Sequence, residues 1–238
     1  MSSAQPRIRP MEDRDVDGAG WIFAHGFVPM MQNVFPSGTT EDLIRARSAR
    51  IGHSLQEVRS GKRPKGRMEV VVRDAVDAAG KVAQEEQLLG FVEWRIVDVE
   101  VERQQRVEAQ EDAKEEDDAL DRIMAMYPSD ARMDLYKKMI SNFDKAHHQY
   151  AGKFRHAYVE ILGVSPRHAR SGAGSLVLEH IAEASAKEDV HNIFLLAAPT
   201  PSAVPFYKKH GYKELAKVTS EGLEDSIAML WTRPENTS

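Results

Sequence analysis

The alternation of hydrophobic and polar residues divides the chain into segments typical of β-strands and of amphipathic helices. In the first part of the chain, the pattern predicts a short strand ended by a proline, then two helices and two β-rich segments. These lie at residues 7–10, 13–27, 37–58, 66–76 and 87–99. The second helix opens with a threonine cap and acidic residues and carries basic residues later, which is a typical helix signature. The residues GKVAQEE between the two β-rich segments are expected to form a long hairpin connection.

The last part of the chain alternates between the same two periodicities. It predicts a strand, a helix, a second strand with an apolar run typical of a sheet interior, a short helix that ends at Gly211, and a closing strand. The strands and the longer helix lie at residues 157–164, 175–188, 192–198 and 226–233. This order of elements predicts a mixed sheet with helices packed on its faces, which is an α/β architecture.

Between these two parts lies a segment of different composition. Residues 100–122 are strongly acidic and contain almost no large apolar side chains, so a solvated helix or loop is expected there rather than an acidic docking tail. Residues 133–150 regain the spacing of an amphipathic helix. We interpret residues 100–153 as a largely helical insertion between two strands of one sheet, within a single domain that spans residues 1–238.

Composition narrows the classes of function. The 238 residues carry a formal net charge of -5, which argues against a general nucleic-acid-binding protein, because such a protein needs a basic surface. Cysteine is absent, which excludes disulfides, thiolate metal sites and a cysteine nucleophile. The longest apolar run, IFLLAA, is too short for a membrane span, and the first residues lack the apolar stretch of a secretory signal. We therefore expect a cytoplasmic protein without nucleic-acid or membrane partners.

The stretch VSPRHARSGAGSL at residues 164–176 places two glycines at the start of a predicted helix. A Walker loop is excluded because Gly174 is not followed by lysine, and a dinucleotide fingerprint because its third glycine position holds Val177. Two interpretations remain. One is a glycine-rich turn without a ligand. The other is a pyrophosphate bound by the successive N–H groups from Arg170 to Ser175, at the positive end of the helix dipole.

The context of this loop resembles motif A of the GCN5-related N-acetyltransferase (GNAT) superfamily. The strand EILGV, the proline after it and RSGAGS follow the family pattern of a strand ending in Val-x-Pro and then Gln/Arg-x-x-Gly-x-Gly/Ala. Further on, LLAAPTPSAVPFYKKHGYKEL resembles the second half of the family's acyl-CoA site, where a turn leads to a helix that carries tyrosine. The resemblance is firm over residues 157–232, looser over 7–99, and fails over 100–153. It departs from the pattern at Ala169, where the family has glutamine or arginine, with Arg170 one place later.

The resemblance implies a mixed, mostly antiparallel sheet with helices on both faces and a helical insertion between the third and fourth main strands. It also implies acetyl-CoA, or a close acyl-CoA, as the donor. The pantetheine arm would lie along a strand edge, much as a peptide adds to a sheet. Gly163 inside that strand indicates a bulge or a close backbone approach, or else a simple strand end. The residues expected to bind the donor are Leu162, Gly163, Val164, Arg170, Ser171, Gly172, Ala173, Gly174, Ser175 and Thr200.

Two residues are candidates for catalysis. Tyr207 matches the family's general acid, and a phenol, whose ordinary pKa is about 10, keeps its proton at neutral pH. Glu160 lies on the motif strand, where strict alternation would place its carboxylate on the same face as Leu162 and make it a base for the attacking amine. An ion pair of Glu160 with Arg155 or His156 is the alternative.

The acceptor pocket is expected to form from the N-terminal helices and the third strand. Aromatic residues there are candidates for its wall, although each is also typical of a core. These candidates are Trp21, Phe27, Phe35 and Trp94. No metal site is expected, because the adjacent His147 and His148 diverge on a helix.

Two hypotheses of function follow. The first is an N-acetyltransferase that moves an acetyl group from acetyl-CoA to a primary amine of a small molecule, by direct attack with Tyr207 as general acid. A variant of it would acetylate a protein N-terminus or a lysine. The alternative is a non-catalytic acyl-CoA-binding or partner-binding module. The sequence leaves open the identity of the amine, the acyl-chain length and the oligomeric state.

Overall fold

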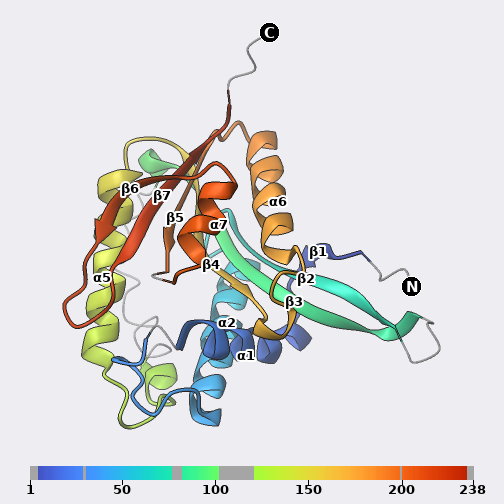
Figure 1. The fold of residues 1–238 in the computed structure, drawn as a ribbon, viewed down its shortest axis with the longest axis vertical. Helices are drawn as coiled ribbons and strands as arrows, with labels where there is room; N and C mark the ends of the chain where they lie inside the picture. Colours follow the sequence, from blue (N-terminus) through green and yellow to red (C-terminus); the bar gives the residue numbers. More distant parts are fainter. Residues whose placement is uncertain (1–4, 29–30, 77–81, 102–120, 199, 235–238) are drawn as a thin grey trace.

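The computed structural model describes residues 5–28, 31–76, 82–101, 121–198 and 200–234 (Figure 1). Its strands form one seven-stranded sheet in the order β1-β2-β3-β4-β5-β7-β6, in which β4 and β5 pair in parallel and the other neighbours pair antiparallel. The strands are β1 (Arg7–Pro10), β2 (Gly66–Val76), β3 (Val82–Val97), β4 (His156–Val164), β5 (Asn192–Ala197), β6 (Lys213–Val218) and β7 (Ser226–Thr232).

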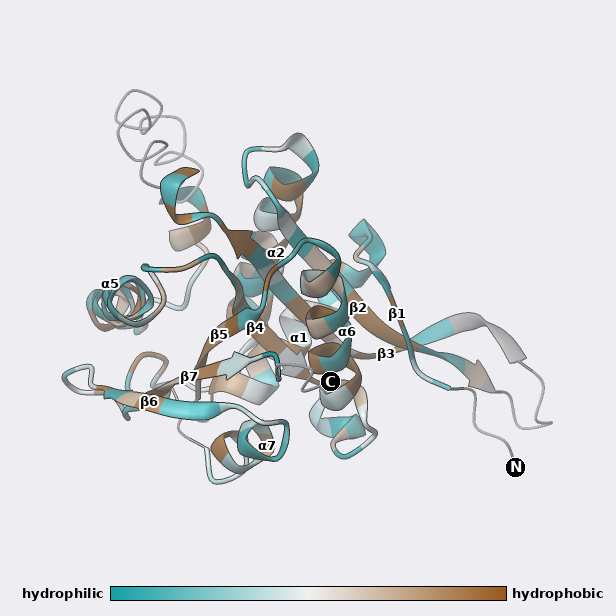
Figure 2. Cartoon of the chain, turned by 90° about the horizontal axis from the view of Figure 1, so that it is seen from above, coloured by the Kyte–Doolittle hydropathy of each residue, from teal (hydrophilic) through white to brown (hydrophobic). Residues whose placement is uncertain are grey.

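Helices cover both faces of this sheet (Figures 1 and 2). Helices α1, α2 and α5 lie on one face and α6 and α7 on the other. Alternate residues of β2 show the two sides, because Val70 and Val72 pack with α1 and α2 while Val71 packs with α6. The expected mixed sheet with helices on both faces is confirmed. The helices are η1 (Asp13–Asp15), α1 (Val16–Phe27), α2 (Glu41–Ser60), α5 (Met133–Tyr150), η3 (Pro166–His168), α6 (Ala173–Lys187) and α7 (Ala203–Lys209).

Helix α2 shows how local sequence sets the ends of an element. The side chain of Thr40 accepts a hydrogen bond from the N–H of Leu43, and Glu41 and Asp42 occupy the first turn at the positive end of the dipole. Gly61, with a φ of 77°, ends the helix in the left-handed conformation that glycine adopts without steric cost. The predicted cap and charge pattern are confirmed.

Two strands differ from the sequence-based expectation. Strand β3 begins at Val82, so part of the expected hairpin connection is strand, and residues 77–81 lie outside the described range. Strand β6 (Lys213–Val218) was not expected. It pairs with β7 alone at the edge of the sheet, and most of its residues are exposed, so it lacks the buried alternate positions that reveal a strand in sequence.

The predicted helical insertion contains α5, which lies between β3 and β4 in sequence and contacts β5, β6 and β7. Ile123, Tyr127 and Leu135, in and before α5, are buried in the same cluster as α1 and α2. The acidic residues 102–120 lie outside the described range, so the solvated helix or loop expected there stays a prediction, as does the single-domain organisation. Among the described helices, none combines the length and the apolar character that a membrane span requires.

Replacing residues 102–120 by a short Gly/Ser linker should leave the thermal stability nearly unchanged, because that segment has few large apolar side chains to bury. The control is Leu135→Ala, which empties a core position and should cost about 2–5 kcal/mol of unfolding free energy. Thermal and denaturant unfolding measure both. A large fall in melting temperature for the linker variant would make the acidic segment structural.

Candidate active site

Strands β4 and β5 part after a short stretch of pairing. They pair at Ala157–Ile193, Tyr158–Phe194 and Val159–Leu195 and not beyond. The remainder of β4 stays paired with β3, and the end of β5 stays paired with β7. The facing edges of the two strands are therefore unpaired, and they are free to accept a ligand that hydrogen-bonds like a strand. Pro199, which is expected to help end the pairing, lies outside the described residues.

A bulge lies in β4 where the parting begins. Glu93 pairs with Ile161 and Trp94 pairs with Val159, so Glu160 has no partner on β3. The extra residue breaks the alternation of faces. Glu160 and Ile161 both line a pocket on the α1–α2–α5 face.

Leu162 instead packs with the cluster on the α6 face. The expectation that Glu160 and Leu162 share one face is therefore wrong, because the bulge inverts the alternation between them.

Gly163 is a point of close approach. A Cβ atom on Gly163 would lie 2.7 Å from the Phe91 ring, and one on Gly90 would lie 2.7 Å from the carbonyl oxygen of Gly163. Of the interpretations left open for Gly163, close backbone approach is the one observed, and the bulge lies at Glu160. The backbone of Leu162–Val164 thus stays against β3 while its other edge faces the parting.

The glycine loop forms an uncapped helix start. Arg170 and Gly172 have φ angles of 64° and 86°, and Gly172 is the N-cap of α6. The helix begins at Ala173, two residues before the predicted start. Its N-cap has no side chain, so the first-turn N–H groups of Ala173, Gly174 and Ser175 have no capping partner and no intrahelical acceptor.

The loop residues fit a polyanion such as the pyrophosphate of coenzyme A. A Cβ on Gly172 would meet no atom within 4 Å, so the backbone there is open to a ligand. The hydroxyl of Ser171 is buried without a hydrogen-bond partner among the described residues. The N–H of Ser171 donates to the carbonyl of His168 at 3.1 Å, so it is occupied within the loop. The backbone N–H groups that are left to bind an anion are those from Gly172 to Ser175.

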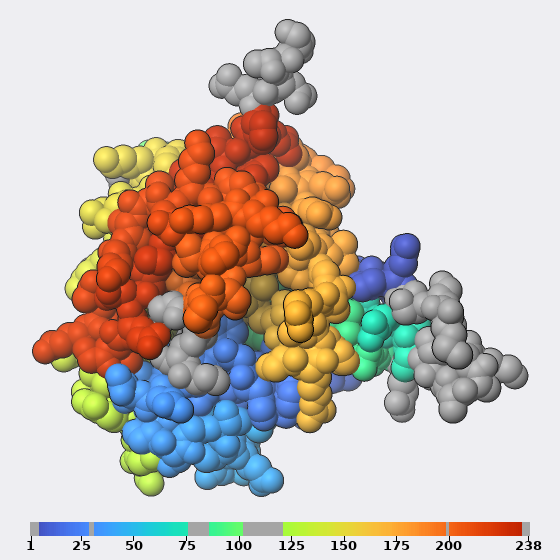
Figure 3. Space-filling view, in the orientation of Figure 1, coloured from blue at the N-terminus to red at the C-terminus, as the bar shows by residue number. Residues whose placement is uncertain are grey.

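Two of the expected donor-binding side chains have partners of their own. The hydroxyl of Ser175 lies 3.0 Å from Nε2 of His210, which ties α6 to the end of α7. The hydroxyl of Thr200 accepts a hydrogen bond from the N–H of Ala203 at 3.0 Å and so holds the start of α7. Figure 3 shows the surface recessed between α7 and the loop that precedes α6.

Tyr207 lies on α7 within the cluster that includes α6, and 9% of it is exposed. Burial raises its pKa to about 12, so the phenol keeps its proton throughout the neutral range. Its ring packs edge-on against Tyr212. Helix α7 contacts β5, and Tyr207 belongs to the cluster on the α6 face of the sheet, whereas Glu160 lines the pocket on the other face.

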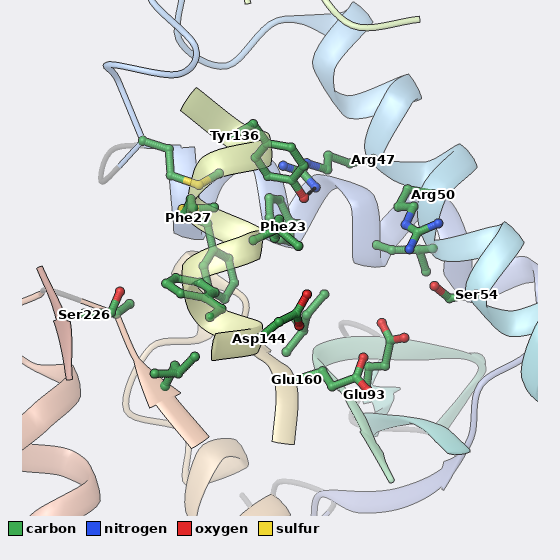
Figure 4. Close-up of a pocket in the computed structure, with 18 of the residues that line it drawn as sticks. Phe23, Phe27, Arg47, Arg50, Ser54, Glu93, Tyr136, Asp144, Glu160 and Ser226 are labelled. Atoms are coloured by element: carbon green, nitrogen blue, oxygen red, sulfur yellow. Dashed lines mark hydrogen bonds between the residues drawn. The ribbon is translucent and has the colours of Figure 1, made fainter. Parts of the chain in front are cut away.

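The pocket on the α1–α2–α5 face has a volume of about 400 Å³ (Figure 4). Its walls come from α1, α2, α5, strands β3 and β4, the end of β5 and the β6–β7 loop. Of the four aromatic candidates, Phe27 lines it. Phe35 and Trp94 are buried in the core, and Trp21 stacks on His25 instead.

Charged groups meet where the pocket touches β3 and β4. Arg63 bridges the carboxylates of Glu93 and Glu160, and Nε of Arg95 lies 2.8 Å from Oε1 of Glu160. Glu93 is 5% exposed, and burial, together with the charge of Glu160, raises its pKa. A carboxylate with a raised pKa binds a proton more readily, so this group of charges is able to accept one from an amine.

The alternative partners of Glu160 are placed elsewhere. Arg155 lies 3.7 Å from the carboxylate of Asp98, and His156 is fully buried with its Nε2 2.7 Å from Nε2 of His147. The ion pairs of Glu160 therefore come from Arg63 and Arg95 and not from Arg155 or His156. Among the described residues, no group of His, Asp and Glu side chains is arranged to hold a metal ion.

Sequence reasoning missed several pocket residues. Glu93 lies in the strand sequence GFVEWRIV, and a charge within an apolar strand is the same signal that singled out Glu160. Arg47 lies four residues from both Leu43 and Ile51 on the buried stripe of α2, where an apolar residue is expected. Both signals were present in the sequence.

The fold agrees with the comparisons to known proteins. The model of the Acetyltransferase (GNAT) family matches residues 79–212, more than half of the chain, and the protein belongs to that family. The predicted resemblance is confirmed. No curated protein sequence matches the chain.

Solved structures share the fold at low sequence identity. A polyamine N-acetyltransferase of Drosophila melanogaster aligns with a TM-score of 0.57 and 11% identity, over 96% of this chain and 100% of that one. A mosquito arylalkylamine N-acetyltransferase-like protein gives 0.55 and 16%, with the same coverage. The PaiA N-acetyltransferase of Thermoplasma acidophilum, in complex with coenzyme A, gives 0.50 and 14%, over 98% and 99%.

Gly172→Val should abolish most of the affinity for acetyl-CoA, because a branched side chain would occupy the open space over the N–H groups and would strain a positive φ. Gly61→Val is the matched control, since Gly61 has a φ of 77° and equally open surroundings at the far end of α2. Both variants should lose similar stability, and only Gly172→Val should lose binding by calorimetry. Undiminished affinity for acetyl-CoA in folded Gly172→Val would contradict an anion site at the N–H groups from Gly172 to Ser175.

Proposed function

We propose that this protein is an acetyl-CoA-dependent N-acetyltransferase that acts on a primary amine of a small molecule. The observation that carries the proposal is the parting of β4 and β5. It has an uncapped helix start on one face and a pocket of about 400 Å³ on the other. Family membership supports acetyl transfer. The coenzyme A complex of one structural neighbour, and the amines in the names of two others, support the donor and the class of acceptor.

On the donor side, the N–H groups from Gly172 to Ser175 would hold the pyrophosphate, with Arg170 nearby. The free edge of Leu162–Val164 would hydrogen-bond the pantetheine arm. The bound thioester supplies an activated acetyl group. A backbone N–H of β4 near the parting would polarise its carbonyl oxygen.

On the acceptor side, the amine must lose a proton before it attacks. We assign this proton to the carboxylates that Arg63 bridges, with Glu160 as the base and Glu93 sharing the charge. The N–C bond then forms, the C–S bond breaks, and Tyr207 donates its phenol proton to the departing thiolate. The proton that the attacking nitrogen loses as the amide forms passes through water to the tyrosinate and restores the phenol. Direct transfer needs no covalent enzyme intermediate, which suits a chain without cysteine.

The shape of the pocket favours a small molecule over the peptide alternative. Helix α5 supplies Tyr136 and Phe143, and the β6–β7 loop supplies Leu223 and Glu224, so walls stand on the side opposite the strands. A polypeptide acceptor would need an open groove across this face. The non-catalytic alternative is disfavoured because the chain carries Tyr207 at the position of the family's general acid and Glu160 in the wall of the pocket.

Tyr207→Phe should lower kcat by about 10²–10⁴-fold, the usual contribution of general acid catalysis, and should change the KM for acetyl-CoA little. Tyr212→Phe is the matched control. Its ring packs on Tyr207, and its buried hydroxyl has no hydrogen-bond partner among the described residues, so turnover should stay near the wild-type rate. A free-thiol release assay with a panel of amines measures both. A wild-type rate for Tyr207→Phe would make water the proton source.

Glu160→Gln should lower the rate at neutral pH, and raising the pH should partly restore it, because amines lose their protons in solution as the pH rises. Glu214→Gln is the control. Glu214 is an exposed carboxylate on the edge strand β6, and it is paired with Lys208 of α7. The measurement is the pH profile of kcat/KM for the amine, compared between the wild type and the two variants. An unchanged profile for Glu160→Gln would assign the base to another group.

A further inference from the structure

Arg47 is a buried cation that has no acidic partner among the residues that the structure describes. It is 3% exposed on α2 and lines the acceptor pocket. One of its nitrogens, Nη1, donates to the hydroxyl of Tyr136 at 3.0 Å, while Nε and Nη2 have no hydrogen-bond partner among the described residues. A buried guanidinium that leaves donors unused is unfavourable, because these donors have lost water and gained nothing in exchange.

Aromatic rings surround this guanidinium. Its carbon lies 4.0 Å from the centre of the Phe23 ring and 4.9 Å from that of Tyr136. Rings at these distances stabilise the positive charge and hold the side chain in place. They accept no hydrogen bond from the edges of the guanidinium, so its unused donors remain available. The side chain is thus fixed, charged and incompletely satisfied, as a preorganised anion-binding group is.

Arg50, one turn further along α2, lines the same pocket, and no ion pair joins it to a carboxylate in the described part of the chain. Figure 4 shows Arg47 and Arg50 on α2 with Tyr136 near Arg47, and Glu93 and Glu160 toward the strands. The other two arginines of the pocket, Arg63 and Arg95, are already paired with Glu93 and Glu160. Arg47 and Arg50 are therefore the basic groups on the α2 wall, while Asp144 on α5 and Glu224 in the β6–β7 loop also line the pocket.

We infer that Arg47, Arg50 and the hydroxyl of Tyr136 bind an oxyanion of the acceptor. The acceptor is then an amine that carries a carboxylate or a phosphate-like group at the end opposite the amine. This inference rests on the proposed function, since the amine has to reach the parting of β4 and β5. Arginine suits the task because its planar fork of donors matches the oxygens of these anions.

The experiment compares ω-amino carboxylates of increasing length, each with the n-alkylamine of the same length, and adds the matching ω-aminoalkyl phosphonates to separate the two kinds of oxyanion. At the best length, kcat/KM for the anionic acceptor should exceed that for the alkylamine by roughly 10- to 100-fold, the contribution of a hydrogen bond to a charged group. Arg47→Gln and Arg50→Gln should lose this preference, so that the ratio of kcat/KM between the anionic acceptor and the alkylamine of the same length falls toward one.

Arg45→Gln is the matched control. Arg45 lies on the same helix with 66% of its side chain exposed, and its partner is Asp42, so the preference should stay intact. Arg50→Gln keeps the inference falsifiable if Arg47→Gln fails to fold, because Arg50 lies at an only partly buried position. A variant of Arg47 that lowers melting temperature but keeps the preference would overturn the inference and make Arg47 a packing residue.

Binding without chemistry separates this inference from the proposed function. Alkyl carboxylates that lack the amine are titrated by calorimetry into the wild type, Arg47→Gln and Arg50→Gln. Binding that both variants lose supports the oxyanion site even if no amine is acetylated. Equal acetylation of charged and uncharged amines, with no carboxylate binding, overturns the oxyanion site and leaves the acetyltransferase standing.

Discussion

The short pairing between β4 and β5 is the constraint on which the rest of the structure depends. After Val159 and Leu195 the two strands share no ladder, although β4 continues to Val164 and β5 to Ala197. Unpaired strand edges inside a sheet are costly unless a ligand or solvent satisfies them. The unpaired edges are the place where we propose that an amide-containing molecule hydrogen-bonds to the sheet.

Each of the parted strands is held by its outer neighbour. Strand β4 follows β3 to Val164, where Gly90 and Gly163 let the two backbones approach too closely for a side chain. Strand β5 follows β7 to its last residue. The bulge at Glu160 bends β4 at the start of the parting and turns two consecutive residues toward the pocket. Backbone geometry thus sets the place that we propose for the donor, and the helices of the opposite face shape the pocket that we propose for the acceptor.

Much of this arrangement could be predicted from the sequence. Periodicity revealed the long helices and the buried strands, and the glycines before α6 indicated a helix start with a bare backbone. The predictions that failed concern features that depend on more than one segment of the chain. The bulge that turns Glu160 away from the face of Leu162 is a property of two paired strands, and the exposed edge strand β6 has no buried stripe. The raised pKa of Tyr207 comes from burial in the folded chain, which no local sequence pattern reports.

A crystal structure of the protein with coenzyme A tests the central claim most directly. The account predicts that the pyrophosphate lies on the N–H groups from Gly172 to Ser175, and that the pantetheine arm runs along the free edge of Leu162–Val164. The thiol should then reach the parting of β4 and β5 beside the Tyr207 hydroxyl. Coenzyme A bound away from the parting, or strands β4 and β5 paired beyond Val159 and Leu195, would contradict the account.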